Sequence, residues 1–318
     1  MGIRGGETTL IQVQDLRKSF GQTRAVDGIT FAVSEGMIYG LLGPNGAGKT
    51  TTISCITGLL MPDGGRIVLD GCELASDPIR FKRSIGVVPQ ETALYPTLTA
   101  YENVAYFASL HGLSGADLRG RAGQILDRVG LSAGSKQQAR TFSGGMKRRL
   151  NLAIGLMHRP RLLLLDEPTV GIDPQARINI LDVVREIQRE GTGILYTTHY
   201  LEEAETLCDR VGIMDHGRVL AEGTVSELRS MVGEGTVVAL RGKFRAEALR
   251  ASIASDPSIH LLSLEDDAAM LSVGGAARAV ADLLSSLLRG GIEVEEISMR
   301  EASLQNVFLK LTGRELRD

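Results

Sequence analysis

The first group of residues along the chain whose types suit chemistry lies in a glycine-rich stretch. In order, they are Gly43, Pro44, Asn45, Gly46, Ala47, Gly48, Lys49, Thr50 and Thr51. The stretch fits the pattern G-x-x-x-x-G-K-[ST], in which glycines let backbone N–H groups converge on phosphate oxygens. Lys49 would add positive charge at the β- and γ-phosphates of a nucleotide, and the Thr50 hydroxyl is suited to Mg²⁺. We expect a phosphate-binding loop, called the P-loop below, between an apolar strand and a helix that begins near Lys49.

Two carboxylates follow a run of leucines later in the chain. Residues 162–165 predict a buried parallel strand, and Asp166 and Glu167 come at its carboxyl end, where such sheets bind ligands. Beside a P-loop, Asp166 can hold Mg²⁺ through water, and Glu167 can orient and deprotonate an attacking water. A pair of solvated acids capping a turn is the alternative, and the leucine run disfavours it.

A histidine ends the next apolar strand. His199 follows residues 193–198 and comes 32 residues after Glu167, so both are expected at the same sheet edge. There its imidazole can donate to the γ-phosphate or hold the attacking water in line. A histidine at a strand end is more often a structural residue, and this alternative stays open on the sequence alone.

Two weaker signals complete the candidate residues. Ser143, Gly144 and Gly145 predict a turn that opens a helix, whose N–H groups and hydroxyl could bind an anion. Alone, such a triplet usually marks only a helix start. Phe20 lies 23 residues before Gly43. An exposed ring there could stack on adenine, whereas a buried ring is the more common outcome.

Alternating strands and helices must position these residues. Before the P-loop we expect short strands over residues 9–14 and 28–33, with a polar turn between them. The other expected segments are strands over 66–71 and 85–90, mostly helix over 91–160, a helix over about 175–190, and strands over 210–214 and 218–222.

Composition bounds the class of protein. Apolar residues make up 43% and charged residues 23%, which is ordinary for a globular chain of 318 residues. The formal net charge of -3 argues against a dedicated nucleic-acid binder. Three widely spaced cysteines predict buried thiols rather than a disulfide framework. Residues 1–6 lack a signal-peptide core, and no apolar run approaches the ~18 residues that span a bilayer. We therefore expect a soluble chain that reaches a membrane only through another subunit.

The C-terminal part of the chain reads as a separate module. Residues 231–236 look like a linker, which would separate a first domain over 8–230 from a second over 236–314. The expected order beyond the linker is strand, helix, two strands, helix and strand, as in a ferredoxin-like unit, and then a helix over 304–312. This part shows no group of site residues in the sequence, so a packing or dimer-forming module is the preferred interpretation.

From about residue 9 to 226, the order and spacing of these motifs resemble the ATP-binding subunit of an ABC transporter. The resemblance implies an α/β P-loop ABC-type ATPase domain with a parallel-sheet core, an antiparallel β subdomain and a helical subdomain. The small C-terminal α+β ferredoxin-like domain would follow it. By the same resemblance, the chain would bind ATP and Mg²⁺.

The resemblance also implies a role for each motif residue. Phe20 looks like the adenine-stacking aromatic, Gly43 to Thr51 like the Walker A loop, and Gln90 like the glutamine that senses Mg²⁺ and γ-phosphate. Ser143-Gly144-Gly145 matches the signature motif, Asp166 the Walker B aspartate, Glu167 the catalytic glutamate, Asp173 the D-loop aspartate and His199 the switch histidine. Catalysis would then depend on Glu167, His199, Lys49 and Gln90, and the metal would be bound by Thr50, Gln90 and Asp166.

Two departures from the family pattern are visible. Phe142 and Met146 flank the signature where leucine and glutamine are commonest, and Ile172 stands where the D-loop usually has leucine. The Ser-Gly-Gly itself is intact, so we expect activity to survive. The string over 142–149 and the tail over 303–313 look like bacterial exporters of the drug-resistance type, whose permease is a separate chain.

The resemblance implies partners as well. Each ATP would lie between the P-loop of one copy and Ser143-Gly144-Gly145 of the other, in a head-to-tail homodimer or in a heterodimer with a related ATPase. A membrane permease would be the other partner, with the chain cytoplasmic and peripheral on the inner face of the cell membrane. No nucleic acid is expected. The competing class is a soluble ABC ATPase of translation or DNA maintenance. That class is disfavoured because the chain has one ATP-binding domain where members of the translation branch usually carry two, and has no heptad insertion of the kind found in DNA-repair members. Its acidic balance also disfavours binding to nucleic acid.

Overall fold

The computed structural model describes residues 8–232, 235–243, 246–253, 256, 258–265, 267–274, 277–289 and 292–313. The stretch 1–6, the middle of the expected linker and position 314 lie outside the described residues, as do some ends of the expected C-terminal helices. Contacts between residues divide the chain into two compact units, Met1–Val219 and Leu220–Asp318. The expected domain bounds, 8–230 and 236–314, stay a prediction.

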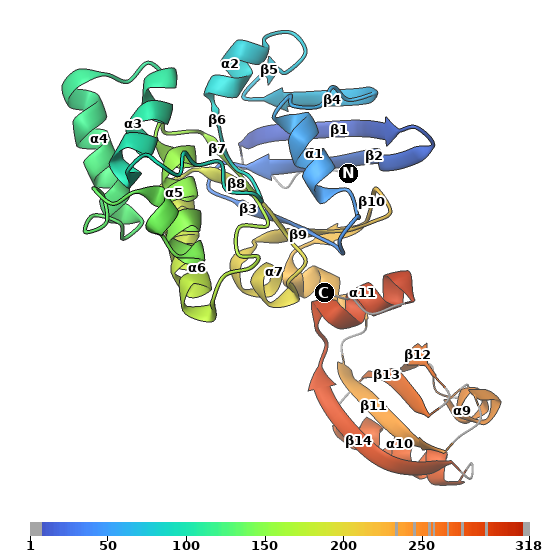
Figure 1. Ribbon diagram of the computed structural model, residues 1–318. Helices are drawn as coiled ribbons and strands as arrows, with labels where there is room; N and C mark the ends of the chain where they lie inside the picture. Colours follow the sequence, from blue (N-terminus) through green and yellow to red (C-terminus); the bar gives the residue numbers. More distant parts are fainter. Residues whose placement is uncertain are drawn as a thin grey trace. The chain divides into compact units, whose positions relative to one another are not determined.

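A six-stranded sheet forms the centre of the first unit (Figure 1), in the order β10-β9-β3-β8-β7-β6. Its strands are β3 (Ile38–Leu42), β6 (Ile85–Val88), β7 (Leu162–Asp166), β8 (Gly193–Thr198), β9 (Arg210–Asp215) and β10 (Arg218–Gly223). The strands from β9 to β6 in this order pair in parallel, so their carboxyl ends meet at one edge. Every residue of β3, β7 and β8 is buried, as expected for strands covered on both faces.

A second sheet is antiparallel, in the order β2-β1-β4-β5. It comprises β1 (Thr9–Phe20), β2 (Thr23–Ser34), β4 (Gly64–Leu69) and β5 (Cys72–Glu73). The polar turn expected between residues 14 and 28 is confined to Gly21 and Gln22, because β1 and β2 are both longer than expected and extend through the charged residues on either side. Register shifts between the two strands accommodate these polar residues at the sheet surface.

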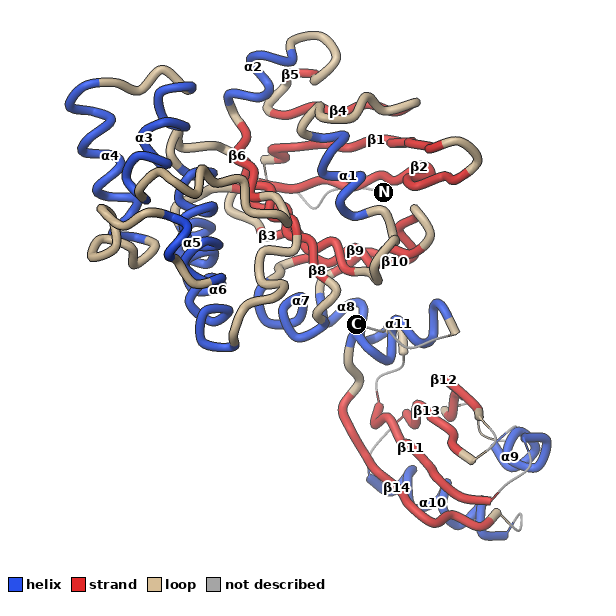
Figure 2. The backbone as a smooth tube through the Cα atoms, viewed as in Figure 1, coloured by secondary structure: helices blue, strands red, loops and turns tan. Residues whose placement is uncertain are grey.

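Helices connect and cover these sheets (Figure 2). They are α1 (Lys49–Ile56), α2 (Pro78–Arg83), α3 (Ala100–Leu110), α4 (Gly115–Arg128), α5 (Gly144–Leu156), α6 (Pro174–Arg189) and α7 (Leu201–Leu207), with a 3-10 turn over Ala139–Thr141. On α1, Ile53 and Ile56 join a core shared by both sheets. The stretch expected to be mostly helical becomes so only at α3, because Thr99 and Glu102 form a capping box that starts this helix.

The second unit contains an antiparallel sheet in the order β12-β13-β11-β14. Its elements are α8 (Val225–Ser230), β11 (Gly235–Lys243), α9 (Ala246–Ile253), β12 (Ile259–Leu264), β13 (Ala268–Gly274), α10 (Ala277–Arg289), β14 (Glu293–Glu301) and α11 (Leu304–Thr312). This strand order confirms the expected ferredoxin-like arrangement. Throughout the described residues, no helix is both long enough and apolar enough to cross a bilayer.

Candidate functional site

The P-loop joins β3 to α1 at the carboxyl edge of the central sheet. Gly43 N donates to Thr198 O of the neighbouring β8 at 3.2 Å. A Cβ on Gly43 would lie 2.2 Å from Met214 O, and one on Gly48 would lie 2.2 Å from Ala25 O. Gly48 also has a φ of 105°, in the left-handed region that favours glycine, and precedes α1. Glycine is therefore required at both positions for the loop to keep this path.

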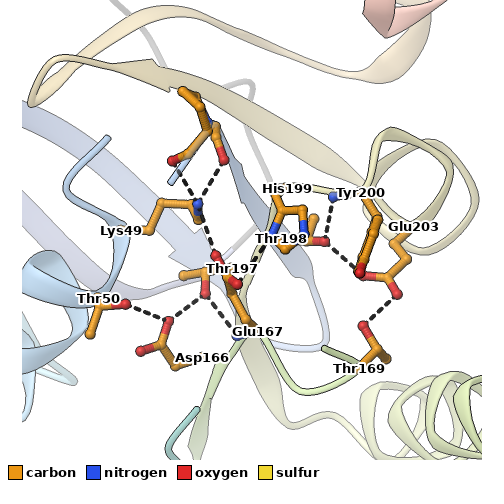
Figure 3. A network of polar contacts seen from close by, with 12 residues as sticks. Lys49, Thr50, Asp166, Glu167, Thr169, Thr197, Thr198, His199, Tyr200 and Glu203 are labelled. Atoms are coloured by element: carbon orange, nitrogen blue, oxygen red, sulfur yellow. Dashed lines mark hydrogen bonds and ion pairs between the residues drawn. The ribbon is translucent and has the colours of Figure 1, made fainter. Parts of the chain in front are cut away.

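Lys49 lies at the centre of a buried polar group (Figure 3). Its Nζ lies 2.6 Å from Gly43 O, 3.0 Å from Pro44 O and 2.9 Å from Glu167 Oε1. The Lys49 and Glu167 side chains are each only 4% exposed. Three oxygens therefore hold the ammonium at the P-loop, where it can exchange one of them for a phosphate oxygen.

Asp166 ends β7 beside the first turn of α1. Its Oδ1 accepts hydrogen bonds from Thr197 Oγ1 at 2.7 Å and from Thr50 Oγ1 at 3.2 Å. Burial raises the pKa of the Asp166 carboxyl, and the two hydroxyls partly oppose this effect. A carboxylate and a hydroxyl are oxygen ligands of the kind that Mg²⁺ accepts beside a phosphate. Among the described residues, no group of three or more His, Cys, Asp or Glu could hold a metal. Mg²⁺ in proteins is commonly bound by one or two such oxygens together with waters and substrate phosphates.

Glu167 follows Asp166 in a strained backbone conformation. Its φ of 44° lies in the left-handed region, which costs about 1–3 kcal/mol for a residue with a side chain. The Glu167 N–H donates to Thr197 Oγ1 at 3.0 Å, which holds the chain in this turn. Its Oε2 lies 3.1 Å from His199 Nδ1, while Oε1 contacts Lys49. The expected meeting of Glu167 and His199 at one sheet edge is confirmed.

Glu203, on α7, is a further member of this polar group that the sequence patterns do not indicate (Figure 3). Its Oε1 accepts hydrogen bonds from Thr169 at 2.5 Å and from Arg177 at 2.7 Å. Its Oε2 accepts from Tyr196 at 2.9 Å and from Thr198 at 2.7 Å. With only 1% of its surface exposed, Glu203 links the segment after β7, the start of α6 and the end of β8. In the sequence, Glu203 is one of three glutamates on this short helix, and that pattern does not mark it as the buried one.

The Ser-Gly-Gly turn opens α5 as expected. Ser143 caps the helix by accepting a hydrogen bond from Met146 N at 3.3 Å, and both Ser143 and Gly144 are exposed. Gly145 is buried against α6, where a Cβ would lie 2.6 Å from Ala176 Cβ. Among the described residues, no hydrogen bond or ion pair joins this turn to the P-loop of the same chain. The turn therefore presents its hydroxyl and helix N-terminus to the outside.

Two other predicted residues lie at exposed element ends. Asp173 caps α6 by accepting from Ala176 N at 3.0 Å. Phe20 ends β1 with 51% of its surface exposed, so the alternative of a buried ring is wrong. Lys18 Nζ lies 5.8 Å from the centroid of the Phe20 ring. An exposed ring at this position is free to stack on a base.

Gln90 follows β6, the strand beside β7. Its backbone segment is anchored to α5, because Arg148 Nη1 donates to Pro89 O at 2.8 Å. The Gln90 side chain is exposed, and within the described part of the chain it makes no hydrogen bond with Thr50 or Asp166. The structure therefore brings Lys49, Thr50, Asp166, Glu167 and His199 together, and leaves Gln90 outside that group. Its expected role stays a prediction.

Comparison with known proteins decides the family. A family model described as ABC transporter matches residues 26–170. The chain is 43% identical to the linearmycin resistance ATP-binding protein of Bacillus subtilis (strain 168), over 97% of this chain and 100% of that protein. The chain belongs to the ABC transporter family.

Other members of the ABC transporter family agree with this assignment. The chain is 39% identical to the Nod factor export ATP-binding protein I of Ralstonia nicotianae, over 98% of this chain and 97% of that protein. A dimeric structure of a bacterial ABC transporter cassette is similar with a TM-score of 0.63 and 26% identity, over 68% of this chain and 98% of that one. These likenesses confirm the P-loop ABC-type ATPase fold.

Membership of this family also defines the activity. The chain is the ATP-binding subunit of an ABC transporter, and its ATP hydrolysis is coupled to transport. The alternative of a soluble ABC ATPase in translation or DNA maintenance is not favoured, because the similar proteins are named for resistance and export.

Proposed function

We propose that this chain hydrolyses Mg²⁺-bound ATP between two copies of itself and thereby drives export through a separate membrane permease. The observation that best supports this proposal is the run of contacts from Lys49 through Glu167 to His199, beside the pair of Thr50 and Asp166. It gathers a cation for phosphate, a carboxylate base and a pair of metal-binding oxygens at one sheet edge.

Glu167 is the proposed general base, and it would take the proton of the attacking water. His199 shares a hydrogen bond with Glu167 Oε2, which steadies the carboxylate and leaves the other ring nitrogen for the γ-phosphate. Lys49 would stabilise the charge on the transferred phosphoryl oxygens. Mg²⁺, held by Thr50 and Asp166 with Gln90 as the sensing residue, would neutralise charge between the β- and γ-phosphates.

The exposed Ser-Gly-Gly turn supports a head-to-tail dimer. A P-loop alone leaves the γ-phosphate open to water, whereas the N-terminus of α5 from a second copy would add N–H donors and a hydroxyl. A twofold pairing of this kind forms two equivalent sites together. The dimeric cassette of similar fold is in keeping with this arrangement.

Cysteine crosslinking tests the dimer, because the native cysteines are buried. In a Glu167→Gln background, the variant Asn45→Cys/Ser143→Cys should give a covalent dimer on oxidation in Mg²⁺-ATP. Each single cysteine variant should give none. A dimer from Asn45→Cys alone would indicate a head-to-head pairing. Failure of the double variant in Mg²⁺-ATP would rule out the shared site.

The proposal of export rests on the similar proteins, which are named for linearmycin resistance and Nod factor export. A chain of this family would work at the inner face of the cell membrane, bound to its permease. The segment from residue 91 to 110, which includes α3, would pass the closing motion of the dimer to that permease.

Affinity purification tests the permease. Tagged Glu167→Gln protein would be recovered in Mg²⁺-ATP from detergent-solubilised membranes and analysed by mass spectrometry, with Lys49→Ala as the control for nucleotide dependence. A stoichiometric partner with several apolar segments of about 20 residues each supports the proposal. Recovery of ribosomal or DNA-associated proteins in its place would contradict it.

A further inference from the structure

A cavity of about 590 Å³ lies within the second unit. It is bordered by the outer face of the sheet, from β11, β13 and β14, and by the first turn of α11. Val237, Ala239 and Met270 give it an apolar wall. Small-molecule sites typically have volumes of about 300–1,000 Å³ and combine an apolar lining with a few convergent polar groups.

Strand register decides which side chains face this cavity. Val237 pairs with Arg300, and Arg241 pairs with Glu296, across β11 and β14. Because side chains alternate between faces, these four residues share the outer face of the sheet. The intervening residues of β11 point the other way, into the core formed with α9 and α10. The cavity is therefore separate from the hydrophobic core of this unit.

Two arginines and two glutamates line the cavity. Arg241 and Arg300 are exposed, and neither makes an ion pair or hydrogen bond with any residue that the structure describes. Of the two glutamates, Glu296 shares the face of the arginines, whereas Glu301 alternates with Arg300 along β14. On the shared face two guanidinium groups therefore stand with one carboxylate, and the donor fork of a guanidinium fits an anionic ligand group.

The start of α11 adds further donors. Asn306 is 7% exposed, and its Oδ1 accepts from Ser303 N at 3.0 Å and from Ser303 Oγ at 2.8 Å. Its Nδ2 contacts Met270 Sδ at 3.2 Å, and a thioether is only a weak acceptor. A buried amide donor with spare capacity therefore borders the cavity. The positive end of α11 lies at the same border.

We propose that this cavity binds a small amphipathic organic anion. Arg241 and Arg300 would hold its anionic group, with Asn306 as a further donor. The apolar part would pack on Val237, Ala239 and Met270. This binding site goes beyond ATP hydrolysis and does not rest on the proposed export function.

The test uses two fluorescent probes that differ by one charged group. The first is 8-anilinonaphthalene-1-sulfonate, and the second is its neutral analogue N-phenyl-1-naphthylamine. Each is titrated into the full chain with saturating Mg²⁺-ADP, which blocks the nucleotide site. We expect saturable binding of the sulfonate. The variant Arg241→Gln/Arg300→Gln should weaken this binding roughly tenfold or more, as for lost charge-assisted hydrogen bonds, and should leave the neutral probe unchanged.

Two further variants serve as a charge control and as a cavity-filling test. Arg250→Gln on α9, which removes one arginine from the opposite side of the sheet, should bind both probes like the native chain. Ala239→Phe should block both probes by filling the cavity, with circular dichroism and thermal unfolding verifying that the variant is folded. Sulfonate binding that survives both the double arginine variant and Ala239→Phe would overturn the proposal. If the double arginine variant weakened the binding of both probes equally, the claim that the two arginines hold the anionic group would be overturned.

Discussion

Glu167 Oε2 lies 3.1 Å from His199 Nδ1, and both residues are more than nine-tenths buried. The same carboxylate contacts Lys49 through its other oxygen at 2.9 Å. One side chain therefore joins the cation of the P-loop to the imidazole at the end of β8. Hydrolysis should depend on this carboxylate more than on any other acid at the sheet edge.

Replacement of Glu167 by glutamine should lower the ATPase rate by about 10²–10⁴-fold, because the amide cannot accept the proton of the attacking water. Binding of ATP should survive, since Lys49 and the P-loop backbone are unchanged. The rate is measured by phosphate release and the binding by a fluorescent ATP analogue. Glu190→Gln, which alters an exposed ion pair with Arg128 on the same unit, is the control and should keep the native rate. A Glu167→Gln chain with native turnover would remove this residue from the mechanism.

His199 is expected to act through Glu167, and a double-mutant cycle measures this dependence. His199→Ala alone should slow hydrolysis by roughly 10–100-fold, since the carboxylate loses its hydrogen-bond partner and the γ-phosphate a donor. In the Glu167→Gln background, the same change should have little further effect. Additive losses in the double variant would mean that the two side chains act independently.

Asp166→Asn should stabilise the chain without nucleotide while abolishing Mg²⁺-dependent hydrolysis. Burial raises the pKa of the Asp166 carboxyl above its ordinary 3.8, so the folded chain binds that proton more tightly than the unfolded chain. Ionisation at neutral pH therefore weakens folding, and the amide removes this cost while still accepting from Thr50 and Thr197.

The increased stability of Asp166→Asn should appear as a higher unfolding temperature at pH 7, by about 2–4 °C for each kcal/mol in a unit of this size. It should shrink as the pH is lowered toward 3.8, where the carboxyl becomes protonated in both states. Asp173→Asn, at an exposed helix cap, is the matched control. A lower unfolding temperature for Asp166→Asn at pH 7 would contradict the burial argument.

Glu203→Gln should destabilise the first unit by about 1–3 kcal/mol, because buried hydroxyl donors lose a carboxylate acceptor and Arg177, whose side chain is 27% exposed, loses its partner charge. Two of the hydroxyl donors to Glu203 would also meet an amide nitrogen rather than an acceptor. Urea unfolding followed by circular dichroism measures the loss. Glu202→Gln, the exposed neighbour on α7, should change the unfolding free energy by no more than about 0.5 kcal/mol. Equal effects at the two positions would show that the buried network contributes nothing.

The stability of the first unit should fall as the pH drops below about 6.5. His158 is largely buried, its Nε2 contacts Ile85 O at 2.8 Å, and its ring stacks on that of His111 with centroids 3.8 Å apart. Burial, and then the His111 charge, lowers the pKa of His158 from 6.5 to about 4. The unfolded chain therefore takes up this proton first, and stability is lost as the pH falls from about 6.5 toward 4.

Unfolding temperatures at several pH values between these limits provide the measurement. His158→Asn should show a flatter profile than the native chain, while His260→Asn, at an exposed position on β12, should follow the native profile. Parallel profiles for His158→Asn and the native chain would exclude His158 as the origin of the loss.

Local patterns made it predictable that the candidate site residues after β3, β7 and β8 meet at one edge of the sheet. The leucines of β7 and the apolar residues of β3 and β8 could only form buried strands, so the residues that follow them had to meet at one edge. The ferredoxin-like order of strands and helices in the second unit was also predictable, because its apolar residues recur with the spacing of strands in some segments and of helices in others. Phe20 and Gln90 show the limit of this reasoning, because exposure and side-chain contacts depend on strand register rather than on motif spacing.

The structural features that the sequence did not reveal are built from residues far apart in the chain. Glu203 draws its donors from β8, from α6 and from the segment after Glu167, and no spacing rule connects these positions. The cavity of the second unit likewise takes its lining from three strands and a helix. Its two arginines are separated by 58 intervening residues and come to the same face of the sheet, four positions apart along it, only through the pairing of β11 with β14.

The backbone of Glu167 carries an evolutionary consequence. Its φ of 44° is a conformation in which glycine is at ease and glutamate is strained. Replacement by glycine would relieve this strain, but it would also leave the buried Lys49 ammonium without the carboxylate oxygen 2.9 Å away. Selection for stability alone therefore gains little by removing this glutamate, and the strained residue can persist for as long as its contact with Lys49 does.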